Sequence, residues 1–188
     1  MTVPDLSISS KSRRSDFPGV KWQSWPFDEK VRLFQEQIQG WVFDVARDIK
    51  QKQIPHADFA ILSILLAYFE NIAKFIEGYT GKFESKSHFV KGVKYVYPKK
   101  FHKKTLELLY DQARNGMYHV GLTGAKVQLN CSISSGFIYK QKCFVVCPEK
   151  LIREIQSHFD QYCNNLKNTK KRTLRKNFEK REKFILGI

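Results

Sequence analysis

The sequence predicts a mainly α-helical bundle of four long helices, with a β-hairpin inserted before the last helix and basic segments at both termini. Three observations predict this fold class. Apolar residues recur every three or four positions in four long stretches, which is the period of an amphipathic helix. Between residues 125 and 147 the pattern is that of a hairpin: residues 127–133 alternate between apolar and polar, residues 134–136 have the composition of a turn, and residues 137–146 form a second β-rich run. The chain has 188 residues, of which 42% are hydrophobic, enough for one core but not for two full domains.

The chain divides into a central domain and two flanking segments. Residues 1–20 lack any apolar period and are expected to be mobile. Residues 21–166 form the bundle domain, with the hairpin at about 125–147. Residues 167–188 form a basic tail, which is either a helix that forms on a polyanion or disordered charge that keeps the chain in solution.

Two long helices open the bundle domain. The first is predicted to start after Pro26, with Asp28 as its N-cap, and to end near Gln53. The second runs from Asp58 to Glu77 and is followed by a glycine that stops it. It is apolar nearly all round, so we expect it at the centre of the bundle. Its apolar run is too short and too charged for a membrane span, and no transmembrane segment is expected.

A third helix is predicted from Thr105 to about His119. Its apolar residues form one stripe that faces the core. At about 100° per residue, Asp111, Asn115 and His119 lie roughly opposite that stripe, and Arg114 lies on its flank. The polar set therefore faces water or a partner. The apolar stripe consists of Leu106, Leu109, Tyr110, Ala113 and Met117.

Two glycines lie near the end of this third helix. Gly116 falls within its last turns and Gly121 just beyond them. Glycine weakens a helix, so the backbone can bend there. In a straight helix the side chains of Arg114 and His119 diverge by about 140°. A bend allows them to converge on one ligand.

The stretch around Arg114 resembles the HEPN superfamily, whose pattern is an arginine, four to six residues, and a histidine. A polar residue usually follows the arginine, and here it is Asn115. The resemblance covers about residues 57–167. It implies a small α-helical domain that dimerises and often acts as a metal-independent endoribonuclease.

The resemblance also implies roles for three residues. His119 acts as general base or acid when an RNA 2′-hydroxyl attacks the adjacent phosphorus. Arg114 holds the phosphate and stabilises its charge, and Asn115 orients the imidazole. No metal and no cofactor is needed. Because cleavage uses both a base and an acid, the resemblance implies a homodimer with two Arg114/His119 pairs near its axis.

Three further residues are candidates for a supporting role in this site: Glu70, Asp111 and Tyr118. Glu70 follows the apolar run of the second helix, where a carboxylate is costly to bury unless it is paired. It either orients Arg114 or His119, or it faces solvent at the edge of the helix.

A second stretch, from Arg153 to His158, has the same spacing. Roughly one such match is expected by chance in a chain of this composition. Arg153 is predicted to point away from the apolar stripe of its helix and His158 to lie at the edge of that stripe. We interpret this second stretch as a chance match.

The net charge of +15 predicts a polyanionic partner, first of all RNA or another nucleic acid. The alternatives are a charge that only keeps the chain in solution, or an anionic membrane. Residues 79–104 interleave lysines with aromatic rings, a composition suited to single-stranded nucleic acid, although an ordinary solvated loop is an equal alternative. His88 and His102 are expected to be exposed in it. The candidate nucleic-acid-binding residues are Lys91, Lys94, Lys99, Lys100, Lys103 and Lys104.

The four cysteines show no paired C-x-x-C spacing, and no secretory signal precedes them. Reduced thiols in the cytoplasm are therefore expected. Cys143 and Cys147 have the spacing of half a metal site, but no matching pair of Cys or His follows.

Two functions from different classes remain open. One is the endoribonuclease, in a toxin, defence or RNA-processing context. The other is a non-catalytic module of the same fold that binds nucleic acid or a protein. An antitoxin or another protein is a further possible partner. Many toxins of the family carry a tyrosine two residues after the histidine, where an antitoxin attaches a nucleotide, but this chain has Gly121 there.

Overall fold

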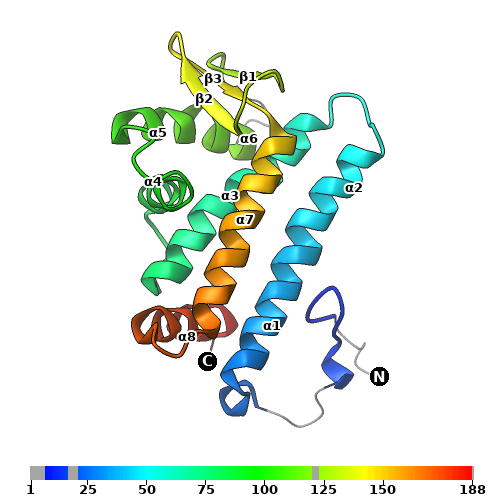
Figure 1. Ribbon diagram of the computed structural model, residues 1–188, viewed down its shortest axis with the longest axis vertical. Coiled ribbons are helices and arrows are strands. Elements are labelled where there is room, and N and C mark those ends of the chain that lie inside the picture. Colours follow the sequence, from blue (N-terminus) through cyan, green and yellow to red (C-terminus); the bar gives the residue numbers. More distant parts are fainter. Residues whose placement is uncertain (1–6, 17–20, 120–122, 188) are drawn as a thin grey trace.

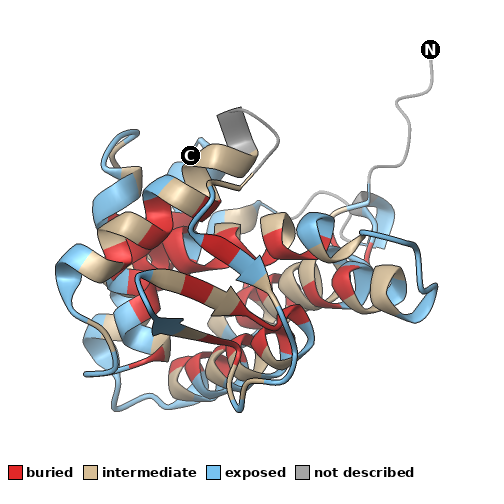
Figure 2. Ribbon diagram, turned by 90° about the horizontal axis from the view of Figure 1, so that it is seen from above, coloured by how far each residue is buried: buried red, intermediate tan, exposed pale blue. Residues whose placement is uncertain are grey.

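A computed structural model describes residues 7–16, 21–119 and 123–187, without the side chains of Arg14, Tyr118 and His119. The chain is mainly helical, with one small sheet at one end of the bundle (Figure 1). The predicted mainly α class is therefore confirmed. Buried residues recur along the helices and occur in all three strands (Figure 2).

The first long helical element is interrupted by one wide turn. It comprises α1 (Phe27–Ile38), a π-helical turn (Gln39–Asp44) and α2 (Val45–Gln51), which follow one another along one edge of the bundle (Figure 1). The helix begins at Phe27, so Asp28 lies in its first turn and is not the predicted N-cap. The prediction of one helix to about residue 53 is otherwise confirmed.

The helix α3 (Asp58–Glu77) is the central element, as predicted. It packs against α4, α7 and α8. It ends at Gly78, whose φ of 62° is the left-handed conformation that glycine adopts most easily. Within the described chain, α3 alone has the length and composition of a membrane span, but 61% of that window is buried inside the protein. It is a core helix, and no clear transmembrane segment is present among the described residues.

The stretch predicted as a basic loop contains the helix α4 (Ser85–Val96), so the loop alternative for it is wrong. The helix lies against α3 because Gly92 allows close approach. A Cβ at Gly92 would lie 1.7 Å from the carbonyl oxygen of Phe69. His88, predicted to be exposed, is only 1% exposed, and its Nδ1 lies 3.0 Å from the carbonyl oxygen of Glu84.

The predicted third helix is present, also with a wide turn. It comprises α5 (Lys103–Leu109), a π-helical turn (Tyr110–Asn115) and α6 (Gly116–His119). Leu106 and Leu109 are buried on its core side. Short π-helical stretches are rare and often occur at functional sites.

The small sheet has three strands, β1 (Val127–Leu129), β2 (Phe137–Lys140) and β3 (Cys143–Val146), in the order β1-β3-β2. The strands β2 and β3 are antiparallel, whereas β1 is parallel to β3. The hairpin is therefore β2-β3, with its turn at Gln141 and Lys142, both at positive φ. The predicted hairpin, which paired residues 127–133 with residues 137–146, was wrong in its register and its turn.

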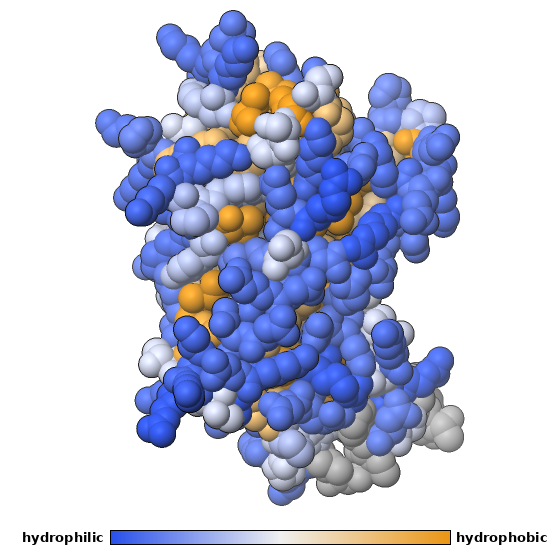
Figure 3. All heavy atoms as spheres, viewed as in Figure 1, coloured by the Kyte–Doolittle hydropathy of each residue, from blue (hydrophilic) through white to orange (hydrophobic). Residues whose placement is uncertain are grey.

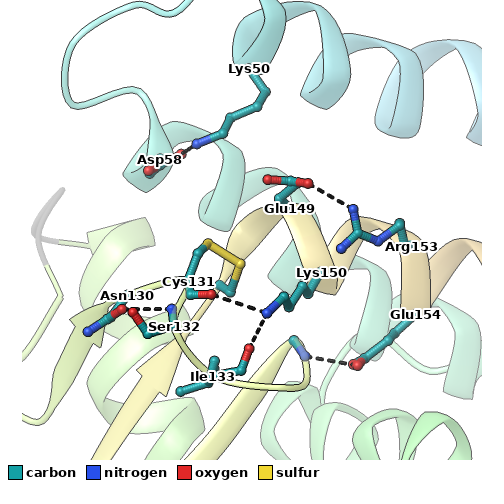
Figure 4. The surroundings of a disulfide bond; sticks show 12 residues. Lys50, Asp58, Asn130, Cys131, Ser132, Ile133, Glu149, Lys150, Arg153 and Glu154 are labelled. Atoms are coloured by element: carbon teal, nitrogen blue, oxygen red, sulfur yellow. Dashed lines mark hydrogen bonds and ion pairs between the residues drawn. A yellow bond between two sulfur atoms is a disulfide. The ribbon is translucent and has the colours of Figure 1, made fainter.

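Residues 130–136 form a loop that is fixed to α7, and we call it the clamped loop. Its Cys131 forms a disulfide with Cys147, so the expectation of reduced thiols was wrong for this pair. Lys150 Nζ donates hydrogen bonds to the carbonyl oxygens of Cys131 and Ile133 (Figure 4). The stretch expected to be the hairpin turn, residues 134–136, lies in this loop.

The last two helices are α7 (Pro148–Lys167) and α8 (Arg172–Leu186). The basic tail is therefore helical, as one of the two alternatives had it, but the helix α8 packs against α3 and does not need a polyanion to form. Phe178 of α8 is fully buried and stacks on Phe75 with the ring centroids 5.8 Å apart. The segment after residue 166 is thus part of the core and not a separate tail.

The described part of the N-terminal segment also contacts the bundle. Ser9 Oγ and Ser12 Oγ donate hydrogen bonds to the carboxylate of Glu36 in α1, at 2.6 and 3.1 Å. Ser9 is 1% exposed. The expected mobility was therefore wrong for residues 7–16, while residues 1–6 and 17–20 lie outside the described chain.

Candidate functional site

The central contact of the candidate site joins Arg114 to Glu70. Arg114 Nη2 lies 3.0 Å from Glu70 Oε2, and the two side chains are 17% and 9% exposed. The guanidinium also lies over the ring of Tyr110, 5.5 Å from its centroid. Glu70 therefore contacts Arg114 and does not face solvent, which decides between the two alternatives for this residue.

Two more side chains complete what we call the Glu70 cluster: Glu70, Lys74, Ser85 and Arg114. Lys74 Nζ and Ser85 Oγ donate hydrogen bonds to Glu70 Oε1. Two cations thus surround one carboxylate, which leaves the cluster with positive charge. Lys74 was not among the predicted site residues, although its position four residues after Glu70 on one helix face was a usable signal.

The pKa of Glu70 reflects this environment. Burial by itself raises the pKa of a carboxyl group, because it disfavours the charged form. The hydrogen bonds from Lys74 and Ser85, together with the charges of Lys74 and Arg114, outweigh burial and lower the pKa of Glu70. The carboxylate is therefore ionised near neutral pH and keeps its hold on the guanidinium.

The other predicted residues of this site lie in different surroundings. Asp111 is exposed and accepts hydrogen bonds from Lys86 of α4, at 2.7 and 3.0 Å, so it links two helices and does not join the Glu70 cluster. Asn115 is half-buried at the end of the π-helical turn. Tyr118 and His119 belong to α6, but their side chains lie outside the described part of the structure, so the convergence of Arg114 and His119 stays a prediction.

The six candidate lysines fall into two groups. Three have partners: Lys91 pairs with Glu77 at 2.7 Å, Lys103 lies 3.7 Å from Glu107, and Lys100 lies over aromatic rings. Burial lowers the pKa of Lys100, although Glu154 opposes this shift. The remaining three are exposed and form no ion pair among the described residues: Lys94, Lys99 and Lys104.

The second Arg–His stretch lines a groove of about 450 Å³ between the C-terminal end of α4 and one face of α7. Arg153 is exposed, as predicted, and its Nη1 lies 2.8 Å from Glu149. His158 is half-buried, and its Nδ1 forms a hydrogen bond of 2.8 Å with the hydroxyl group of Tyr68. The predicted orientations are confirmed, but the interpretation as a chance match missed the groove that the two residues share.

The surface and the comparisons add two observations. Hydrophilic residues cover most of the face seen in Figure 3, with a few small apolar patches between them.

Comparison with family models, curated proteins and solved structures found no match. Function must therefore be argued from the geometry of the site and the charge of the chain.

Proposed function

We propose that this protein is a metal-independent endoribonuclease of the HEPN type. The observation that supports this proposal most directly is the contact between Glu70 and Arg114. The buried, ionised carboxylate of Glu70 holds the guanidinium of Arg114 in place. Arg114 and His119, five positions later, belong to the same helical element. An arginine fixed in this way is pre-organised to bind a phosphate.

The chemistry assigned to the site is attack of an RNA 2′-hydroxyl on the adjacent phosphorus. The bond from phosphorus to the 5′-oxygen breaks, leaving a 2′,3′-cyclic phosphate and a 5′-hydroxyl. One imidazole accepts the proton of the 2′-hydroxyl, and a second group gives a proton to the leaving oxygen. Arg114 stabilises the charge on the phosphate oxygens, and the large positive charge of the chain favours a neutral His119 that can act as the base.

A homodimer supplies the second proton-transfer group in this proposal. Each protomer brings one His119, so two protomers around a two-fold axis bring both a base and an acid. A protein that is monomeric in solution would argue against this arrangement. Analytical ultracentrifugation of the full chain at the concentrations used in cleavage assays tests it.

The experiment for the activity is incubation of the protein with RNA in EDTA. Cleavage should persist without divalent metal and should yield 2′,3′-cyclic phosphate ends. The variant His119→Ala should abolish it. The matched control is His102→Ala, because His102 is an exposed histidine at the start of α5. Equal cleavage by wild type and His119→Ala would exclude the proposed role of His119.

The second candidate is a non-catalytic module that binds nucleic acid. Three exposed lysines that have no acidic partner in the described part of the chain favour it: Lys94, Lys99 and Lys104. When such cations bind phosphates, counterions are released and the affinity increases. In this case RNA binds with a steep salt dependence, but none is cleaved. A binding isotherm and a cleavage assay on the same RNA separate the two candidates.

A further inference from the structure

The groove between α4 and α7 has two chemically different walls. The α4 side is aromatic and apolar, and its residues are Tyr95, Val96, Tyr97 and Pro98. The α7 side is polar and consists of Arg153, Glu154, Ser157, His158 and Gln161. A volume of about 450 Å³ lies within the usual range of small-ligand pockets, about 300–1,000 Å³.

The aromatic wall offers a fixed ring. Tyr95 is 39% exposed, and its hydroxyl group donates a hydrogen bond of 3.1 Å to Glu77, which restrains the side chain. An exposed ring that is already held in place loses little conformational freedom when a flat ligand stacks on it. Bases of single-stranded nucleic acids stack on such rings without regard to sequence.

The polar wall offers hydrogen bonds from three uncharged side chains. His158 uses Nδ1 for Tyr68, and its other ring nitrogen has no hydrogen-bond partner among the described residues. Burial lowers the pKa of His158 to about 4, so the imidazole is neutral at pH 7. Ser157 and Gln161 lie one helical turn apart on the same side of α7 and add a hydroxyl and an amide group.

The charges at the groove differ between its centre, which is acidic, and its edge, which is basic. Glu154 faces the groove, but its carboxylate already accepts hydrogen bonds from the Tyr97 hydroxyl and from the backbone N–H of Gly136. A carboxylate there disfavours a phosphate in the middle of the groove. Arg153 is exposed at the groove, and the exposed Lys99 directly follows Pro98, so cations suited to phosphates lie at or next to its edge.

We propose that this groove binds one unpaired base of a single-stranded RNA, stacked on Tyr95 and hydrogen-bonded by Ser157, His158 and Gln161, with the flanking phosphates at Arg153 and Lys99. The choice of RNA as the ligand rests on the proposed function. The groove would then hold a nucleotide of the substrate away from the cleaved bond, and the sequence spacing shared by Arg153 and His158 serves binding and not catalysis.

The test is binding of a fluorescent single-stranded 2′-O-methyl oligonucleotide to the full-length protein, measured by anisotropy. This probe has no free 2′-hydroxyl and is not cleaved, so binding is measured apart from turnover. We expect Tyr95→Ala to raise Kd about 10-fold, the effect of one lost stacking contact. Tyr95→Phe keeps the ring and loses only the hydrogen bond to Glu77, so it should raise Kd much less than Tyr95→Ala does. The matched control is Tyr139→Ala, since Tyr139 in β2 is 37% exposed.

A second pair of variants tests the polar wall. Gln161→Ala should weaken binding severalfold. Arg153→Ala should weaken it and lower its salt dependence, whereas Arg47→Ala should not. Arg47 is a matched control because it is a half-buried arginine that is also paired with an acid of the same helical element, Asp44 at 3.1 Å.

The outcomes separate this proposal from the proposed function. If Tyr95→Ala and Gln161→Ala bind the probe like wild type, or if wild type does not bind it, the groove is not a base site, whatever the cleavage assay shows. If RNA is not cleaved but Tyr95→Ala loses affinity and Tyr139→Ala does not, the base site stands and the endoribonuclease fails.

Discussion

Two stretches of this chain share an arginine and a histidine five positions apart, and they lie in opposite environments. Arg114 is largely buried and bonded to a buried carboxylate of another helix. Arg153 is exposed and bonded to Glu149, four residues earlier on its own helix. The spacing alone therefore does not define a site. What differs is whether a neighbouring element presents a charged group to the guanidinium.

The backbone explains part of this difference. Arg114 belongs to the π-helical turn, whereas Arg153 lies within α7, a regular helix of 20 residues. A π-helical turn alters the angles at which side chains leave a helix. Arg114, predicted on the flank of the core stripe, meets Glu70 of α3, while Arg153 keeps the outward direction expected of a regular amphipathic helix.

The largest expected difference between the two stretches is in RNA cleavage. Arg114→Ala should lower kcat by about 100-fold or more, because it removes donors that stabilise the phosphate in the transition state. Arg153→Ala should leave kcat unchanged and raise KM, because it weakens only binding. Steady-state kinetics with a short RNA measure both. A loss of kcat in Arg153→Ala as large as in Arg114→Ala would remove the distinction.

Stability should separate the two arginine partners next. Glu70→Ala leaves two largely buried cations without their carboxylate and should lower the free energy of unfolding by about 3–5 kcal/mol. Glu149→Ala breaks an exposed pair and should cost less than about 1 kcal/mol. Urea unfolding followed by circular dichroism measures both values. Similar midpoints for the two variants would show that the Glu70 cluster is not coupled to the fold.

The disulfide belongs to the surroundings of the second stretch, because it ties the clamped loop to the start of α7, the helix that carries Arg153 and His158. It joins residues 16 apart in sequence, and Cys131→Ser should lower the free energy of unfolding by about 3 kcal/mol. Cys143→Ser is the control, since Cys143 in β3 is a free thiol. Thermal unfolding with and without a reducing agent checks this. Wild type should lose stability on reduction, and Cys131→Ser should show no further loss.

The smallest effect is the pH dependence of the second stretch. The pKa of His158 falls from 6.5 to about 4 on folding because of burial. The contribution of neutral His158 to the free energy of unfolding is therefore full above pH 6.5 and is lost as the pH falls through 4. Allowing for partial exposure, this contribution is about 2 kcal/mol. His158→Gln should unfold with a flatter dependence on pH between 4 and 6.5.

This measurement must be a difference between wild type and variant, because Glu182 acts in the opposite direction. Burial raises the pKa of Glu182 from 4.5 to about 8, with Glu179 adding to the shift and Lys30 opposing it. Its contribution to stability is full below pH 4.5 and is lost as the pH rises to 8. An unchanged slope in His158→Gln would mean that His158 does not titrate as a buried group.

The helices with a clear apolar period could be predicted from the sequence. The helix α3 and its stop at Gly78 follow from composition and from one left-handed glycine, and the packing stripe of α7 follows from its spacing. The helix α4 was missed because its lysines dominate the composition. Its buried residues Phe89 and Val93, four apart, were the available signal.

Other features depend on contacts that a sequence pattern does not encode. The pairing of Cys131 with Cys147 requires the clamped loop to turn back onto α7, and no spacing rule predicts that. The two π-helical turns depend on local packing and not on period. In the site, Glu70 was a candidate because a carboxylate beside an apolar run needs a partner, but which cation it meets is a tertiary fact.

The burial of Phe178 has a consequence for how the C-terminal charge is studied. Cutting the chain after Leu166 would remove an aromatic side chain that fills space between Phe27, Phe34 and Phe75, and so would open a hole in the hydrophobic interior. A shortened protein that no longer binds RNA or vesicles would then report collapse of the bundle as much as lost charge. Replacing the exposed lysines of α8 by glutamine, with Phe178 kept, removes the charge and spares the interior.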